Sequence, residues 1–272
     1  MPYDDFSIRM KAYEAFETER RFIPLLPVYA RLDGRSFSAF TKGMERPFDP
    51  RMTAVMIATT KHLVQATHAK IGYTQSDEIS LVWRAGEYKE SIFFDGRVMK
   101  MASVLASMTT AAFTKFLLES ELAPYAKKLP HFDGRVLSFP TETEAANMFL
   151  WRVADATKNA ISMAARHYYS HKALHGKNGA EMQEMLFQKG VNFNDYPTSF
   201  KRGTFVRRTV ERQRLPEATL AKLAALGKND LRPDGMYDRS VVKEIDMPIF
   251  SKVTNRTQVI FQGDDPILTI ES

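Results

Sequence analysis

The chain has 272 residues and no cysteine, which excludes disulfide bonds, cysteine-ligated zinc, iron–sulfur clusters and thiol catalysis. Its hydrophobic fraction of 44% and charged fraction of 26% are those of an ordinary globular protein, and its net charge of +6 favours a polyanionic partner. Because no apolar run approaches about 18 to 20 residues, and the acidic start at 1–5 lacks the pattern of a signal peptide, we expect a cytoplasmic protein with no membrane partner.

Strands and helices alternate in the first half of the chain. An acidic cap at Asp4 or Asp5 and apolar residues at helical spacing predict the first helix, and periodicity predicts the elements after it. In chain order we expect a helix at about 6–18, a strand at 26–32, a helix from 51, strands at 70–75 and 78–83, a helix from 97 and a strand at 135–139.

This order of elements is the split βαβ arrangement of the ferredoxin-like unit, an α+β fold also found in the palm domains of polymerases and nucleotidyl cyclases. In that arrangement the end of the first strand meets the hairpin between the second and third strands. Asp33-Gly34 lies at the first place and Ser76-Asp77-Glu78 at the second. The topology therefore predicts that Asp33 and Asp77 lie within range of a shared metal ion.

Two converging carboxylates are typical of a magnesium site, because Mg²⁺ prefers oxygen ligands and is usually held by one or two carboxylates plus substrate phosphates. The implied chemistry is phosphoryl or nucleotidyl transfer. The alternative is an ordinary turn: Asp-Gly is a common turn dipeptide. It occurs four times here, beginning at Asp33, Asp95, Asp133 and Asp234.

The second half of the chain is predicted to be helical from about 142 to 175, with a break at 176–179. A helix, a loop and a strand at 203–210 follow, then a helix ending near Leu226 and a stretch punctuated by Pro and Gly. We expect two parts, a palm-like catalytic core with an N-terminal helix at 1–140, and a helical, basic extension at 141–272 that serves RNA binding or oligomerisation.

A basic run lies between Lys201 and Arg214. It contains six cations against one acid, Glu211, and the cations are Lys201, Arg202, Arg207, Arg208, Arg212 and Arg214. Such crowding favours an anionic partner, so the run is a candidate contact for the RNA backbone. The alternative is a solvated face of a strand.

Five motifs in order resemble the tRNA-His guanylyltransferases, most closely their bacterial and archaeal guanylyltransferase-like relatives. They are RLDGRSF at 31–37, GYTQSDE at 72–78, FDGRV at 132–136, WRVAD at 151–155 and KRGT at 201–204. The resemblance covers about residues 5–208. It implies addition of nucleotides to an RNA 5′ end in the 3′-to-5′ direction, after ATP activates the 5′-monophosphate.

The resemblance also implies roles for residues of the predicted site. Asp33, Asp77 and the backbone carbonyl of Gly34 would hold two Mg²⁺ ions, and Glu78 would add negative charge as a third catalytic residue. ATP and GTP or another nucleoside triphosphate would be the substrates, and the nucleotide-binding residues would be Asp33, Gly34, Arg35, Ser36, Phe37, Ser38, Ser76, Asp77, Arg97 and Lys100. For Arg97 and Lys100, an exposed helix end with no ligand is the alternative.

One departure from the family pattern bears on the substrate. Eukaryotic members carry His-Ile-Asn-Asn where this chain has Thr157-Lys158-Asn159-Ala160, so the histidine tied to recognition of tRNA-His is missing. This favours templated repair of truncated tRNA 5′ ends over addition of a single guanylate to tRNA-His. More distant alternatives are a palm-type nucleotide cyclase and a non-catalytic RNA-binding protein.

The expected partner is tRNA, at its 5′ end and acceptor stem. Its contacts would be Lys158 and Asn159 together with Lys201, Arg202, Arg207 and Arg208 of the basic run. The family resemblance suggests a homotetramer.

Overall fold

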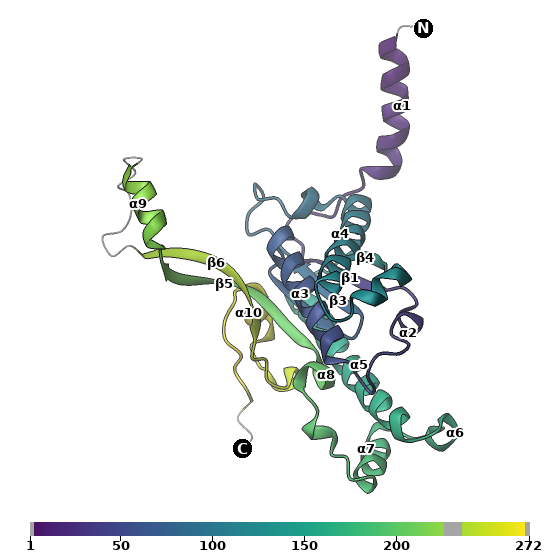
Figure 1. Cartoon of the computed structure of the whole chain (residues 1–272). Coiled ribbons are helices and arrows are strands. Elements are labelled where there is room, and N and C mark those ends of the chain that lie inside the picture. The colour runs from purple at the N-terminus through teal and green to yellow at the C-terminus, as the bar shows by residue number, and fades with distance from the viewer. Residues whose placement is uncertain (1–2, 226–235, 270–272) are drawn as a thin grey trace.

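The computed structural model describes residues 3–225 and 236–269. Its centre is an antiparallel sheet of six strands in the order β4-β1-β3-β2-β5-β6 (Figure 1). The strands are β1 (Val28–Gly34), β2 (Ile71–Gln75), β3 (Glu78–Trp83), β4 (Phe132–Ser138), β5 (Thr204–Arg214) and β6 (Met236–Ile245).

Ten α-helices accompany these strands in the described residues. They are α1 (Tyr3–Thr18), α2 (Phe37–Phe40), α3 (Pro50–Thr67), α4 (Val98–Leu118), α5 (Glu142–Tyr168), α6 (His171–Leu174), α7 (Gly179–Gln188), α8 (Thr198–Arg202), α9 (Glu217–Ala225) and α10 (Arg256–Phe261). Four short 3₁₀ helices lie at Phe93–Gly96, Ala123–Lys128, Phe193–Asp195 and Phe250–Lys252.

The first four strands and helices α3 and α4 form the predicted split βαβ unit. Strands β4, β1, β3 and β2 are neighbours in the order of a ferredoxin-like sheet, and α3 and α4 cover one face of it. Leu32, Ile79 and Phe113 are fully buried between the sheet and these helices. The predicted α+β fold is therefore confirmed.

Local sequence signals explain where α3 begins. The side chain of Asp49 accepts a hydrogen bond from the backbone N of Arg51 at 3.0 Å and thereby caps the helix. Pro50 occupies the first helical position, where its missing N–H costs nothing. The start of α3 is thus fixed directly after the loop at residues 41–49, which forms one wall of the cavity described below.

The opposite face of the sheet is covered by α5. Tyr29 and Tyr73 are buried there against Phe149 and Phe205, and the hydroxyl of Tyr29 is hydrogen-bonded to that of Ser80 at 2.6 Å. α10 packs in the same cluster. Residues beyond 140 therefore complete the core of the palm sheet.

The second half of the chain is less helical than the sequence pattern predicts. β5 extends to Arg214, well past 210, and pairs along its length with β6, which the sequence pattern did not reveal. Both strands continue the palm sheet past β2, so the predicted boundary at 140 divides a shared sheet. The predicted helix to 175 ends at Tyr168, and Ser170 caps a separate α6. Leu226 and Asp234-Gly235 lie outside the described residues.

Among residues 3–225 and 236–269, one helix, α4, is long and apolar enough to cross a membrane by length and composition alone. This corrects the expectation that no apolar run approaches that length. Met101, Leu105, Phe113 and Leu117 on α4 are buried in the core under the sheet, as in the core helix of a globular fold.

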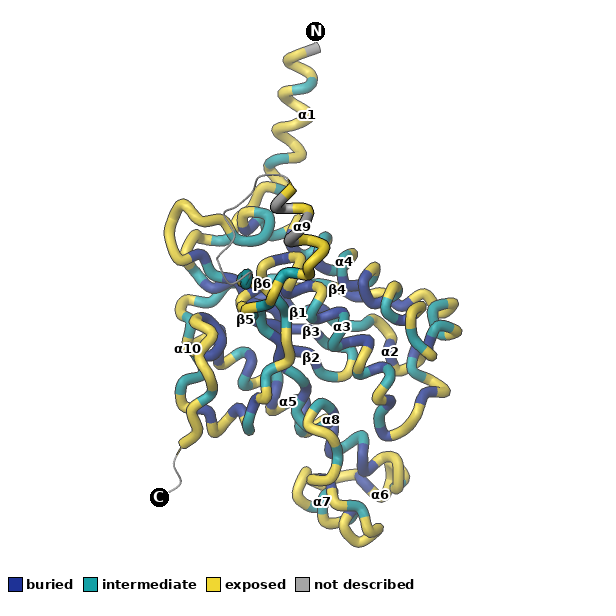
Figure 2. The backbone as a smooth tube through the Cα atoms, turned by 60° about the vertical axis from the view of Figure 1, so that its left-hand side comes forward, coloured by how far each residue is buried: buried dark blue, intermediate teal, exposed yellow. Residues whose placement is uncertain are grey.

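The first helix projects away from the body of the molecule, and most of it is exposed (Figures 1 and 2). Phe16 is 87% exposed and Tyr13 is 65% exposed. The predicted homotetramer stays a prediction.

Candidate active site

The two acidic motifs meet at one end of the palm sheet, as the topology predicts. Asp33 pairs with Glu78 in the β1–β3 ladder, and the backbone N of Gly34 donates a hydrogen bond to the carbonyl oxygen of Asp77 at 3.0 Å. Asp33 and Gly34 are the last residues of β1, because the strand continues two residues beyond its predicted end to pair with β4. The ladder on both sides of β1 thus fixes the position of Asp33.

Unusual backbone conformations shape the turns beside the acids. Ser76 at the β2–β3 tip has a φ of 54° and Ser36 has a φ of 57°, both in the left-handed region. A Cβ atom at Gly34 would lie 2.3 Å from the buried ring of Phe37. Only glycine leaves room for that ring under the turn, so Gly34 has a steric role beside the site.

Burial raises the pKa values of two acids at this end of the sheet, Asp77 and Glu78. Burial, assisted by the negative charge of Asp33, raises the pKa of Asp77 to about 6. No salt bridge to Asp33 or Asp77 occurs in the described residues. A bound divalent cation would relieve this repulsion, so the donor set fits a hard metal ion.

The donor set also indicates which kind of metal. The described residues contain no group of three or more His, Cys, Asp or Glu side chains placed to hold an ion. Two carboxylates and nearby backbone carbonyl oxygens suit Mg²⁺, which takes its remaining ligands from water and substrate phosphates.

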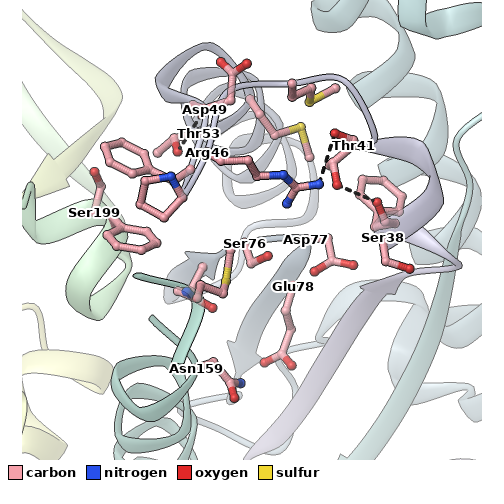
Figure 3. A pocket seen from close by; sticks show the side chains of 18 of the residues that line it. Ser38, Thr41, Arg46, Asp49, Thr53, Ser76, Asp77, Glu78, Asn159 and Ser199 are labelled. Carbon is pink, nitrogen blue, oxygen red and sulfur yellow. Dashed lines mark hydrogen bonds between the residues drawn. The ribbon is translucent and has the colours of Figure 1, made fainter. Parts of the chain in front are cut away.

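A cavity of about 720 Å³ opens in front of the acids (Figure 3). Its floor is the β2–β3 tip with Asp33. One wall is formed by Arg46 and the loop to the start of α3, and the other by α5 with Asn159 and Arg166. Neither Arg46 nor Arg166 has a carboxylate partner within the described parts of the chain. The cavity thus combines paired acids with an arginine on each wall, an arrangement suited to a metal-bound polyphosphate.

Sequence comparison identifies the family. The sequence model described as tRNAHis guanylyltransferase matches residues 8–140. The tRNA(His) guanylyltransferase of Saccharomyces cerevisiae is 30% identical over 72% of this chain and 88% of that protein. The chain belongs to the tRNA(His) guanylyltransferase family. It is accordingly a nucleotidyltransferase, and the resemblance inferred from the motifs is confirmed.

Solved structures of the guanylyltransferase family share the fold. A bacterial tRNA(His) guanylyltransferase-like protein in complex with ATP superposes with a TM-score of 0.75 at 33% identity, covering 94% of this chain and 97% of the other. The Saccharomyces cerevisiae enzyme superposes with a TM-score of 0.62 at 26% identity, covering 72% of this chain and 91% of the other.

Glu78 is placed differently from Asp77. In Figure 3 its carboxylate turns away from that of Asp77. Both of its oxygens accept hydrogen bonds from Arg152 on α5, at 2.7 and 2.6 Å. The negative charge that Glu78 is predicted to add at the metal site is therefore balanced by a guanidinium, and its catalytic role stays a prediction.

The predicted nucleotide-binding residues separate into three groups. Asp33, Phe37, Ser38, Ser76 and Asp77 line the cavity. The second group is the turn between Asp33 and Phe37. It consists of Gly34, Arg35 and Ser36, which do not line the cavity.

The third group, Arg97 and Lys100, does not line this cavity. Both lie at the start of α4, where the ammonium of Lys100 stands over the ring of Phe94 at 5.0 Å. The neighbouring Phe93 stacks on Trp83 at the far end of β3. Within one chain the structure thus places the start of α4 away from Asp33 and Asp77.

The predicted RNA contacts also differ in their surroundings. Asn159 lines the cavity, and Lys158 beside it is exposed. Lys201 donates to the carbonyl of Asn194, and Arg202 lies beside it in α8.

The two arginines of β5 are already engaged within the chain. Arg207 donates to the carboxylate of Asp265 at 2.9 Å, and Arg208 donates to the carbonyl oxygens of Val64 and Gln65 at the end of α3. Their role in RNA binding stays a prediction.

Sequence reasoning missed much of the cavity wall. The lining residues without an assigned role include Arg46, Phe48, Asp49, Ser162, Met163, Arg166, Ser199 and Phe200. A signal existed on α5, because Arg152, Asn159, Met163 and Arg166 recur at intervals of seven, four and three, which places them on one face of a helix.

Proposed function

We propose that this enzyme adds nucleotides to tRNA 5′ ends in the 3′-to-5′ direction, reading the opposing strand as template, after ATP activates the 5′-phosphate. The observation that carries the proposal is the cavity that joins Asp33 and Asp77 to Arg46 on one wall and Arg166 on the other. The proposal is supported by the similarity to bacterial guanylyltransferase-like proteins, which are described in complex with ATP and with GTP.

Asp33, Asp77 and the backbone carbonyl of Gly34 would hold Mg²⁺, two ions in the proposed mechanism. When bound, the ions would supply charge stabilisation for the reacting phosphates. The chain's own contribution is placement: β1 and the β2–β3 tip hold the carboxylates, and Arg46 and Arg166 offer donors for the remaining phosphate charge.

The proposed reaction has two steps, each a displacement at phosphorus. In the first, an oxygen of the RNA 5′-monophosphate attacks the α-phosphorus of ATP, and pyrophosphate leaves. In the second, the 3′-hydroxyl of the incoming nucleoside triphosphate loses its proton and attacks the activated 5′-phosphorus, and AMP leaves. The new 5′ end carries the triphosphate of the added nucleotide.

Templated repair is favoured over addition of one guanylate by the stretch that replaces the family's histidine. Thr157 bonds back to the carbonyl of Val153, Lys158 is exposed, and Asn159 alone of the three lines the cavity. The broader match to the bacterial guanylyltransferase-like protein, 94% of this chain against 72% for the yeast enzyme, points in the same direction.

The test compares 5′-truncated tRNAs that differ only in the base opposite the missing nucleotide, or only in the anticodon. Each is incubated with Mg²⁺, ATP and all four labelled nucleotides, and the added residue is mapped. We expect C opposite G, G opposite C, and several tRNA species as substrates. Addition of G whatever the opposing base, and only with the histidine anticodon, would instead identify a conventional guanylyltransferase.

Two controls exclude the remaining alternatives. Incubation with nucleotide alone tests for a cyclic product, which would identify a cyclase. Binding of tRNA without any nucleotide addition, in the presence of Mg²⁺ and ATP, would identify a non-catalytic RNA-binding protein.

A further inference from the structure

The ion pair between Glu78 and Arg152 joins two elements that meet only through the fold. Arg152 Nε donates to Glu78 Oε1 at 2.7 Å and Arg152 Nη2 donates to Oε2 at 2.6 Å, so the guanidinium and the carboxylate meet as a bidentate fork. Their side chains are only 12% and 14% exposed. A fork of this geometry, largely removed from water, fixes both groups in position.

Further contacts restrain the fork from both ends. Arg152 Nη1 lies 3.2 Å from Asp155, and its guanidinium lies 4.6 Å from the ring centroid of Trp151. On the other side, Arg31 Nε lies 4.0 Å from Glu78 and has no hydrogen-bond partner among the described residues. Glu78 therefore faces two cations, and its charge is balanced by them.

The position of the fork connects it to the site. Glu78 directly follows Asp77 in the chain and pairs with Asp33 across the ladder. Arg152 lies on the same face of α5 as Asn159 and Arg166, which line the cavity. The fork thus ties the floor that carries both acids to the helix that forms one wall.

We infer that Glu78 and Arg152 act as one positioning unit, which holds Asp77 and the α5 wall in register for metal and substrate, and that Glu78 is not itself a metal ligand. The inference rests on the metal site of the proposed function. It also assigns a role to the Trp-Arg motif at 151–155, which the proposed chemistry does not use.

The competing role, Glu78 as a direct ligand, makes a different prediction. A ligand is lost only when Glu78 itself is changed, whereas a positioning unit fails equally when either partner is changed. If the two residues act as one unit, the double variant should lose no more Mn²⁺ affinity than a single variant, because the first substitution already removes the interaction.

The experiment compares E78Q, R152Q, the double variant and R152K in the full chain, with D77N as the reference for loss of a metal ligand. Mn²⁺ binding is measured by electron paramagnetic resonance without RNA, and kcat and KM are measured with truncated tRNA. R84Q is the matched control, because Arg84 joins the sheet to the same helix through Glu142 at 2.5 Å but does not line the cavity.

We expect E78Q and R152Q each to weaken Mn²⁺ binding by about tenfold, as is typical for groups that orient metal ligands, and to lower kcat while the KM for tRNA stays within about twofold. The double variant should match the worse single variant. R152K should recover part of the loss, because it keeps the charge without the fork. R84Q should bind Mn²⁺ like the wild type.

Three results would overturn the inference. E78Q could lose Mn²⁺ binding as completely as D77N while R152Q binds normally, which would make Glu78 a ligand. E78Q and R152Q could both bind Mn²⁺ like the wild type, which would show that the ion pair does not position the metal ligands. R84Q could weaken Mn²⁺ binding as much as R152Q, which would show that any loss of contact between α5 and the sheet has this effect.

Thermal melts accompany each variant. If a single variant is unfolded at the assay temperature, the double variant, which removes both charges of the fork together, and R152K decide the question. Because Mn²⁺ binding is measured without RNA, a wild-type enzyme that adds no nucleotide would refute the proposed function while leaving this test intact.

Discussion

The end of the palm sheet concentrates negative charge and strand β5 of the β5–β6 hairpin concentrates positive charge, and the two regions differ in how far salt bridges compensate it. At the palm end, Asp33 and Asp77 are crowded together, and burial with the charge of Asp33 raises the pKa of Asp77 to about 6. Along the hairpin, Arg207 bonds to Asp265, and Lys243 pairs with Glu211. We therefore expect the uncompensated acids to depend on a bound cation more strongly than the compensated arginines depend on RNA.

The largest expected effect follows from the uncompensated acids. Asp33→Asn or Asp77→Asn should abolish nucleotide addition, because each removes a metal ligand, with a loss on the order of several kcal/mol of transition-state stabilisation. The fold should persist in circular dichroism.

Asp133→Asn is the matched control. Asp133 also belongs to an Asp-Gly pair and stands opposite Asp33 in the ladder, yet its side chain is 52% exposed and lies 3.6 Å from Arg135. Activity within tenfold of wild type in either site variant would contradict the metal-site assignment.

The next effect tests the steric role of Gly34. Gly34→Ala should lower the free energy of unfolding by about 1 to 3 kcal/mol and also reduce activity, because the new methyl group meets the buried ring of Phe37. Urea titration measures the first effect. Gly179→Ala, whose Cβ would lie 3.8 Å from Ile161, is the control, and equal stability of the two variants would refute the steric argument.

A smaller effect concerns Asp49, whose charge is compensated within the chain. Its hydrogen bond with Arg51 holds the pKa of Asp49 below its usual value. The folded pKa is depressed, so the stabilisation is complete above the unfolded pKa of about 3.9 and is lost as the pH falls through the folded pKa.

Asp49→Asn should therefore lower stability by about 1 kcal/mol near pH 7, a difference that shrinks below about pH 4. Melting temperatures of both proteins between pH 3 and 7 measure it. A constant difference across that range would show that the charge of Asp49 is irrelevant.

The smallest effect is expected in the hairpin. Replacing Arg207 and Arg208 by Gln should weaken RNA binding alike for all sequences and flatten its salt dependence by about 0.9 in the log–log slope for each phosphate that is no longer neutralised. Because both arginines also contact Asp265 and the end of α3, the melting temperature is recorded in parallel. A lower melting temperature with an unchanged salt slope would leave them a purely structural role.

Local periodicity and turn chemistry were enough to predict the palm. The apolar strand segments and the helical spacing are properties of neighbouring residues, so the sequence carries them directly. The rule that a split βαβ unit brings its first strand next to its hairpin then placed Asp33 beside Asp77.

The sequence by itself therefore determined the fold class, the family and the two acids of the site. Only the tertiary structure decided that Glu78 is neutralised by Arg152, 74 residues away, that β6 pairs with β5, and that Arg97 lies outside the cavity. The reason is physical. Whether a buried charge is compensated depends on the partner that the completed fold brings within hydrogen-bonding distance, and no local sequence pattern encodes that partner.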